Sequence, residues 1–261
     1  MPLRFDVSWG AMSLDTVIPA AAGWALFLDV DGTLLEIAET PDAVKVPPRL
    51  KDLLTEVAVR VDGAIALVTG RTLADLDRLF TPLRLCAAGG HGSEYREATG
   101  CVVRPPFQSG FLDGAREELM RFVRLREGLL LEDKGYGLAV HFRRAPHLAP
   151  DVLDVMRRQR HALGASVALQ AGKCVFELRP AGMTKGTAIA TFLRQQPFLQ
   201  RTPVFVGDDL TDEHAFAVVN DYGGLSIKVG DGLQTLAKHR LGGVADVLRW
   251  LERFPASTEY V

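Results

Sequence analysis

The sequence predicts an α/β fold, namely a Rossmann-like core with a parallel sheet, interrupted by an inserted α+β cap. The first and last thirds of the chain alternate short apolar runs with amphipathic stretches. The middle third instead follows the order helix, strand, strand, helix, strand, strand. Pro and Gly interrupt these patterns near residues 105–106 and 180–182. We therefore expect an N-terminal leader (1–23), an α/β core (24–107 and 183–261) and an α+β cap (108–182).

Strands and helices alternate in the first third. Apolar runs at 24–30, 64–68 and 83–88 predict three buried strands. Pro47-Pro48 opens the first predicted helix, which places Leu50, Leu53, Leu54 and Val57 on one face. A second helix is expected over 72–80. Strands separated by helices imply right-handed crossovers and a parallel sheet.

The middle third has a different rhythm. Amphipathic helices are expected over 110–127 and 151–163. Residues 129–134 and 137–142 predict one hairpin, and residues 166–171 and 174–178 predict another. Two helices and two hairpins in this order indicate a small α+β module of its own.

The last third returns to alternation. Thr184 is a suitable cap for the next helix. Strands at 203–206 and 224–229 and helices at 211–219 and 244–254 complete the pattern. One α/β core would thus be interrupted by the smaller module, so that the two parts of its sheet meet across the insertion.

Composition narrows the class of protein. The 261 residues are 48% hydrophobic with a formal net charge of -2, so no basic excess suggests a nucleic-acid partner. Cys86, Cys101 and Cys174 are scattered and odd in number, which favours a reducing compartment without disulfides. No apolar run approaches the roughly 18 residues that cross a bilayer, and the run up to residue 28 reads as a first core strand rather than a signal peptide. We expect a cytoplasmic protein without a membrane partner, either a monomer or a weak dimer.

Polar residues follow the predicted strands where each strand ends. Asp29 and Asp31 follow the first strand, and Thr69 and Arg71 follow the second; Lys185 opens the helix after the insert, and Asp208, Asp209 and Asp212 follow a later strand. The carboxyl ends of neighbouring parallel strands form one crevice. So many carboxylates repel one another, and a divalent cation relieves this; Mg²⁺ suits an all-oxygen site that also binds phosphate.

Each of these residues also has a plainer interpretation. An Asp-x-Asp pair alone is common in solvated turns, and an isolated lysine such as Lys185 is usually a surface residue. Asp212 could simply favour the N-terminus of its helix. Thr69 could be no more than a strand-end residue. The four segments in order, rather than any one of them, indicate a site.

The motifs resemble those of a known superfamily. Four segments resemble the motifs of the haloacid dehalogenase phosphatase superfamily: Asp29-Val30-Asp31-Gly32-Thr33, Thr69, Lys185 and Gly207-Asp208-Asp209-Leu210-Thr211-Asp212. Further segments resemble the trehalose-6-phosphate phosphatase family: Val68-Thr69-Gly70-Arg71, Gly90-His91-Gly92-Ser93-Glu94, Val140-His141-Phe142-Arg143, Glu177-Leu178-Arg179-Pro180 and Thr184-Lys185-Gly186. The resemblance spans residues 26–251 and includes the position and size of the insert, which resembles the mobile cap of that superfamily.

The resemblance implies roles for the core residues. Asp29 would attack phosphorus, and Asp31 would protonate the leaving oxygen and then activate water. Thr69 would donate to a phosphoryl oxygen and Lys185 would neutralise charge there. Mg²⁺ would bridge Asp29, the backbone carbonyl of Asp31 and the Asp208 carboxylate. Asp209 and Asp212 would hold metal-bound waters or position Lys185.

Substrate recognition is expected from the other wall of the crevice. Candidate residues for binding sugar hydroxyls are Arg71, His91 and Glu94 in the core and Lys134, His141, Arg143, Lys173, Glu177 and Arg179 in the cap. By resemblance, cap lysine, arginine and glutamate residues grip the distal glucose, and Lys173 and Glu177 are the first choices. Local roles remain open: His91 could only fix its loop, and His141 could pair across its hairpin. Glu132 and Lys134 could be a same-face pair on a strand, and Arg143 a solvated strand end.

The predicted function is therefore Mg²⁺-dependent hydrolysis of a disaccharide phosphate, trehalose 6-phosphate by resemblance, as the last step of trehalose biosynthesis. The alternatives are a phosphatase for another sugar phosphate, such as sucrose phosphate or a glycosyl-phosphoglycerate, and, less favoured, a phosphomutase. A catalytically silent sugar-phosphate sensor is the rival from a different class. The presence of both Asp29 and Asp31 argues against the sensor, because binding alone needs neither a nucleophile nor an acid.

Overall fold

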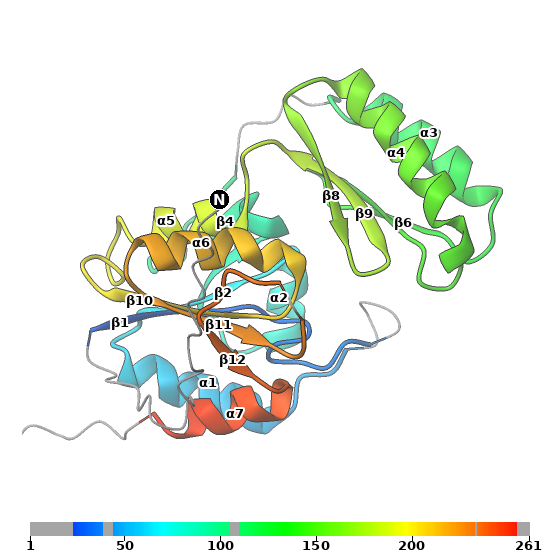
Figure 1. Ribbon diagram of the computed structural model, residues 1–261. Helices are drawn as coiled ribbons and strands as arrows, with labels where there is room; N and C mark the ends of the chain where they lie inside the picture. Colours follow the sequence, from blue (N-terminus) through cyan, green and yellow to red (C-terminus); the bar gives the residue numbers. More distant parts are fainter. Residues whose placement is uncertain (1–22, 39–43, 105–109, 233, 255–261) are drawn as a thin grey trace, which may run out of the picture.

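The computed structural model describes residues 23–38, 44–104, 110–232 and 234–254. Figure 1 shows two bodies, a larger one around a long sheet and a smaller one at the upper right. The expected leader, apart from residue 23, and the expected first boundary near 105–108 lie outside the described residues. The exact domain limits therefore stay a prediction.

The larger body is built on an eight-stranded sheet. Its order is β12 (His239–Leu241), β11 (Leu225–Val229), β10 (Thr202–Gly207), β1 (Trp24–Leu28), β2 (Ile65–Val68), β3 (Cys86–Gly89), β4 (Glu94–Arg96) and β5 (Val102–Val103). The strands from β12 to β3 pair in parallel, whereas β4 and β5 pair antiparallel. The expected parallel sheet is thus extended at one edge by a short antiparallel ribbon that the sequence pattern does not reveal.

The insertion does not separate the sheet into two halves. β1 pairs directly with β10, with Leu28 beside Val206, although more than half of the chain lies between them. The backbone of Asp29 donates to the carbonyl of Val206 at 2.9 Å. The carboxyl ends of β1 and β10 therefore lie side by side, and the polar residues that follow both strands meet at one edge.

Helices cover both faces of this sheet (Figure 1). One face packs against α1 (Pro48–Arg60), α2 (Leu73–Phe80) and α7 (Val244–Glu252), and the other packs against α5 (Lys185–Phe192) and α6 (Glu213–Asp221). The apolar stripe of α1, which includes Leu50, Leu54 and Val57, is buried in the first of these two cores. A sheet covered on both faces explains why β1 and β2 are apolar throughout.

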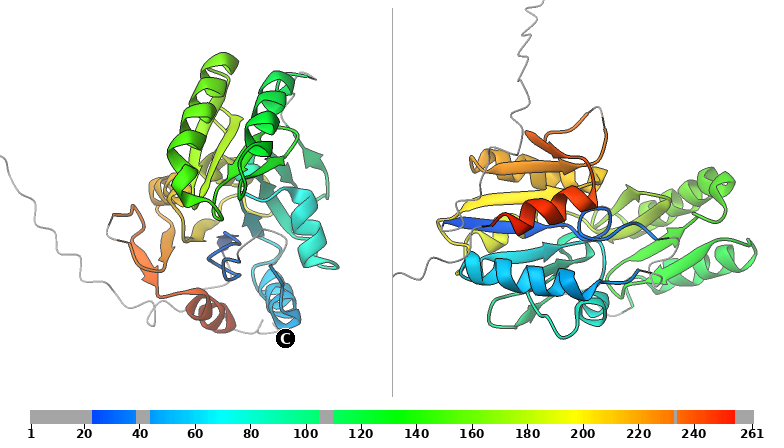
Figure 2. Two further views of the ribbon diagram at one scale, coloured as in Figure 1. Left: turned by 90° about the vertical axis from the view of Figure 1, so that its right-hand side faces the viewer. Right: turned by 90° about the horizontal axis from the view of Figure 1, so that it is seen from below.

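The smaller body, residues 113–180, is called the insert below. It contains α3 (Asp113–Arg124), α4 (Ala149–Leu163) and an antiparallel sheet in the order β6 (Leu130–Asp133), β7 (Leu138–His141), β9 (Val175–Pro180), β8 (Val167–Gly172). Figure 2 shows α3 and α4 side by side on one face of this sheet. The two predicted hairpins and two predicted helices are all present.

Alternation along the insert strands separates an apolar face from a polar face. Leu138, Val140 and Leu178 pack into the core beneath α3 and α4. The side chains between them, including His141 and Glu177, point to the opposite face because successive residues of a strand alternate. The insert thus presents a polar surface to the larger body.

Two other features complete the fold. The helix expected over 211–219 begins as a 3-10 turn (Leu210–Asp212) and continues as α6. Asp212 ends this turn with its side chain fully buried. No helix in the described part of the chain is both long and apolar enough to cross a lipid bilayer.

Candidate active site

Asp29 and Lys185 form the centre of the site. Asp29 follows β1 and is 3% exposed, and Lys185 opens α5 and is also 3% exposed. The Lys185 Nζ lies 2.7 Å from Asp29 Oδ1 and 2.6 Å from Asp212 Oδ1. A capping box at Thr184 begins α5, which places Lys185 in its first turn. One ammonium group therefore joins two buried carboxylates from different parts of the chain.

A third carboxylate joins this pair. Carboxylate oxygens of Asp29, Asp208 and Asp212 lie within 4.8 Å of one another, which makes the group a candidate metal site. Gly32 is required for the approach of Asp208, because a Cβ at this position would lie 2.1 Å from the Asp208 carboxylate. With φ of +82°, Gly32 also adopts a backbone conformation that favours glycine.

The electrostatics of this cluster favour an added positive charge. Burial and then the Asp212 carboxylate raise the pKa of Asp208 to about 6. Burial raises the pKa of Asp29; Lys185 opposes this rise, and Asp212 and Asp208 add to it. Burial alone would lower the pKa of Lys185, but Asp212 and Asp29 raise it above its ordinary value. Three acids with one ammonium group leave excess negative charge.

The oxygen atoms left over fit a cation. Asp212 uses both of its oxygens, since Oδ1 binds Lys185 and Oδ2 accepts from the Asp209 backbone at 2.8 Å. Asp208 Oδ1 is instead buried without a hydrogen-bond partner. Hard oxygen donors with unsatisfied charge suit Mg²⁺ or a similar divalent ion. The residues present therefore fit a divalent cation, the predicted kind of cofactor.

Asp31 is held by an arginine. Arg71 Nε lies 2.7 Å from Asp31 Oδ2, and Arg71 Nη2 lies 2.7 Å from Asp31 Oδ1. Arg71 is 8% exposed, and its backbone nitrogen donates to Thr69 Oγ1 at 3.1 Å. This two-point contact fixes the carboxylate plane of Asp31. Arg71, which the sequence suggested as a sugar ligand, thus contacts a core acid here.

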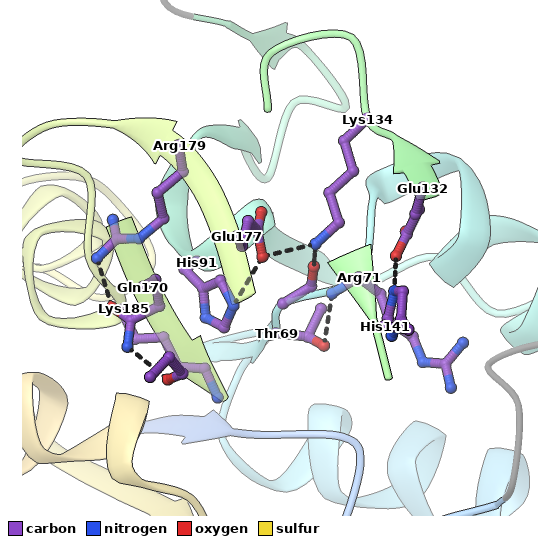
Figure 3. A network of polar contacts seen from close by, with 12 residues as sticks. Thr69, Arg71, His91, Glu132, Lys134, His141, Gln170, Glu177, Arg179 and Lys185 are labelled. Carbon is purple, nitrogen blue, oxygen red and sulfur yellow. Dashed lines mark hydrogen bonds and ion pairs between the residues drawn. The ribbon is translucent and has the colours of Figure 1, made fainter. Parts of the chain in front are cut away.

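A second buried ion pair, between Lys134 and Glu177, lies within the insert and contacts the core (Figure 3). Lys134 Nζ lies 2.9 Å from Glu177 Oε2 and donates to the Gly70 carbonyl at 2.9 Å. His91 Nε2 lies 3.6 Å from the same Glu177 oxygen, which exceeds an ordinary hydrogen bond. Burial opposes ionisation of Glu177, but the Lys134 charge prevails and lowers its pKa to about 2. The insert therefore rests on the loop that carries Thr69 and Arg71.

A cavity of about 400 Å³ lies between the core and the polar face of the insert. Such a volume falls within the range of roughly 300–1,000 Å³ that is usual for small-ligand sites. From the core, the predicted residues that line it are Asp29, Asp31, Thr69, Arg71, His91, Lys185, Asp208 and Asp209. From the insert, those that line it are Lys134, His141, Arg143, Lys173 and Glu177.

Two of the residues predicted to bind substrate, Glu94 and Arg179, lie outside the cavity lining. Glu94 is 3% exposed; its carboxylate accepts from the Leu73 backbone at 2.7 Å and from Arg104 at 2.9 Å. Arg179 is 5% exposed and donates to Gln170 at 2.9 Å. Neither Glu94 nor Arg179 is among the described residues that line the cavity. Their contacts are those of residues that support the walls.

Sequence reasoning gave too little weight to Glu132 and Asp212. Glu132 lines the cavity and contacts His141 Nε2 at 2.7 Å across the β6–β7 hairpin. Strand alternation puts Glu132 on the same face as Lys134, and this pattern indicated that Glu132 would face the cavity. No local pattern in the sequence indicated that Asp212 would be buried, because an acid in a first helical turn is ordinarily a solvated residue.

The fold of the chain has counterparts among solved structures. The chain is similar in structure to a haloacid dehalogenase-like hydrolase from Bacteroides thetaiotaomicron, with a TM-score of 0.65 over 87% of this chain and 98% of the other. Their sequences are 13% identical, so this likeness concerns the fold. The core with its inserted module thus shares the fold of that protein.

Sequence comparison is more specific. The trehalose-phosphatase family profile matches residues 27–239. The chain is 44% identical to the trehalose-6-phosphate phosphatase of Escherichia coli K12 over 89% of its own length and 86% of the relative's. A crystal structure of a trehalose-6-phosphate phosphatase related protein is 28% identical, with a TM-score of 0.72 over 87% of this chain and 95% of that one. The chain belongs to the trehalose-phosphatase family.

Proposed function

We propose that this protein hydrolyses trehalose 6-phosphate to trehalose and phosphate, through a phosphoryl group carried on Asp29. The observation that supports this most directly is the Asp29 carboxylate, buried beside Lys185 at the floor of the cavity between core and insert. Family membership supplies the substrate, since the Escherichia coli relative that matches most of this chain is a trehalose-6-phosphate phosphatase.

In the first half of the reaction, an Asp29 oxygen attacks phosphorus, and the bond between phosphorus and the sugar oxygen breaks. That oxygen takes a proton from Asp31. In the second half, water gives a proton to Asp31 while its oxygen attacks phosphorus, which releases phosphate and restores the Asp29 carboxylate. Arg71 orients Asp31 for both transfers through its two contacts of 2.7 Å.

Positive charge is needed where the phosphate monoester enters an acidic site. Lys185 supplies one charge beside Asp29, and Thr69 on the cavity wall offers a hydroxyl donor. Asp29, Asp208 and the backbone carbonyl of Asp31 would hold Mg²⁺, while Asp212 positions Lys185 and Asp209 caps the following turn. When bound, the cation offsets the negative charge of the phosphoryl oxygens.

Specificity would come from the insert acting as a cap. Lys134, His141, Lys173 and Glu177 line the upper part of the cavity and offer both donors and acceptors to sugar hydroxyls. The hairpin tip that carries Lys173 reaches the core, because a Cβ on Gly172 would lie 4.0 Å from an Asp209 carboxylate oxygen. A closed cap of this kind excludes bulk water from the phosphoryl group. We expect the enzyme to act in the cytoplasm as a monomer or weak dimer.

Phosphate release from trehalose 6-phosphate with Mg²⁺ tests the proposal. Asp29→Asn should lower the rate by about a thousandfold or more, because an amide is a poor nucleophile. Unchanged thermal unfolding of this variant would show that the loss is chemical. Glucose 6-phosphate and sucrose 6-phosphate serve as competing substrates. Equal turnover of all three would remove the assignment to trehalose 6-phosphate, and binding without any phosphate release would instead support a sensor.

A further inference from the structure

Lys228 is a buried lysine with no part in the mechanism above. It lies on β11 and is 8% exposed. Its neighbours Ile227 and Val229 pack into the core beneath α1 and α7. Since strand residues alternate, Lys228 points to the opposite face of the sheet, toward the α6 side. Lys228 is not among the described residues that line the cavity, so it does not reach the substrate there.

The partner of Lys228 is the peptide that carries a metal-site carboxylate. The Lys228 Nζ donates to the backbone carbonyl oxygen of Asp208. Lys228 also pairs in register with Gly207, the residue just before Asp208. This contact holds the backbone at the end of β10 from the side of β11.

The Asp208 carboxylate needs such support because it is buried beside other carboxylates, which repel it. Its Oδ1 is buried without a partner, and the Asp29 and Asp212 carboxylates lie within 4.8 Å. Because Gly32 has no side chain, it leaves room for the Asp208 carboxylate, but it makes no contact that would hold the carboxylate in place. The Lys228 contact is a charged hydrogen bond to the same residue, and such bonds are among the stronger ones in proteins.

We propose that Lys228 is a positioning residue that fixes the Asp208 peptide, so that the Asp208 carboxylate is preformed for a divalent cation. This inference rests on the proposed function, in which Asp208 is a metal ligand. Lys228 thereby acts on cation affinity from behind the site, without contacting either the cation or the sugar phosphate.

A positioning role and a purely electrostatic role predict opposite changes in Mg²⁺ affinity when Lys228 is replaced. An ammonium group near a cation site repels the cation, so removing its charge alone would tighten Mg²⁺ binding. Loss of a residue that orients a metal ligand instead typically weakens binding about 10- to 100-fold. The sign of the change therefore separates the two roles.

The experiment measures the Mg²⁺ dissociation constant of the whole protein by titration calorimetry, together with the rise in unfolding temperature that Mg²⁺ causes. Lys228→Met, which keeps an unbranched side chain of nearly the same length but removes the donor, should weaken binding about tenfold. Lys228→Arg, which keeps a cationic donor, should retain most of the affinity. The exposed Lys238→Met is the control and should match wild type. Asp208→Asn should abolish binding.

The outcomes are distinct. Unchanged or tighter Mg²⁺ binding by folded Lys228→Met overturns the inference. If Lys228→Met does not fold, Lys228→Leu, which also lacks a donor, replaces it with the same criterion. Failure of wild type to bind Mg²⁺ would contradict the proposed metal site itself, which is a separate result. In Lys228→Met, the KM for trehalose 6-phosphate at saturating Mg²⁺ should stay within about twofold of the wild-type value. A much larger rise would indicate that Lys228 contacts the substrate, and would contradict the inference.

Discussion

Two buried lysines, one in the core and one in the insert, face opposite sides of the same cavity. Lys185 is 3% exposed and contacts two carboxylates, with a third close by. Lys134 is 6% exposed and contacts the single carboxylate of Glu177 and one backbone carbonyl. The core cluster therefore has an excess of negative charge, whereas the pair in the insert is balanced.

The balance of charge around each lysine explains why Lys185 and Lys134 have different roles. Buried carboxylates in excess require a cation, and this favours phosphate chemistry in the core. A balanced ion pair needs no added ion, so Lys134 and Glu177 can exchange their contacts for sugar hydroxyls. The core would thus supply reactivity and the insert would supply recognition. Four expected outcomes test this contrast.

Of the two lysine substitutions, the larger effect is expected for Lys185→Met. Removing this ammonium leaves Asp29 and Asp212 repelling each other and takes away charge that the phosphoryl group needs. Turnover of trehalose 6-phosphate and of a generic aryl phosphate should fall together, by roughly a hundredfold or more in kcat/KM. Steady-state kinetics on both substrates checks this. A loss confined to trehalose 6-phosphate would contradict a role in chemistry.

Lys134→Met should act more selectively. The variant breaks the Glu177 pair and the contact with the Gly70 carbonyl but leaves the acid cluster intact. For trehalose 6-phosphate, kcat/KM should fall about 10- to 100-fold, while the aryl phosphate changes by less than about threefold. The exposed Lys238→Met serves as the matched control. Equal losses on both substrates would assign Lys134 to closure or folding rather than to recognition.

Removal of divalent cations should separate the two regions further. Chelation removes the cation that offsets the excess negative charge of the core carboxylates, so activity on every phosphate ester should fall to background and return with added Mg²⁺. The balanced pair in the insert should be unaffected. Full activity in the presence of a strong chelator would refute the metal site formed by Asp29 and Asp208.

The last expected outcome concerns the free energy of unfolding at low pH rather than activity. The pKa of Glu177 is about 2 in the folded protein against 4.5 for the free side chain. A lowered folded-state pKa stabilises the protein above pH 4.5, and this contribution is lost as pH falls from about 4.5 toward 2. The shift corresponds to about 3 kcal/mol. Urea unfolding between pH 2 and 5 should therefore show a shallower pH dependence for Glu177→Gln than for wild type; equal slopes would contradict the ion pair.

Local patterns were enough for the order of elements. Continuous apolar runs predicted the strands β1, β2 and β10, and alternating runs broken by turn residues predicted both hairpins of the insert, because these segments bury one or both faces. The strands β4, β5 and β12 have only two or three residues each, which is too short to show a period. Their pairing depends on neighbours in the sheet rather than on their own sequence.

The sequence by itself determined which residue types stand at the carboxyl ends of β1 and β10, and hence that Asp29 and Asp208 would meet. Only the tertiary structure decided which partner each side chain takes. Arg71 contacts Asp31, 40 residues away, rather than facing only the cavity, and Glu94 turns into the wall. Strand ends are fixed by local patterns, but side-chain partners depend on how segments far apart in the sequence pack against one another, which no local pattern records.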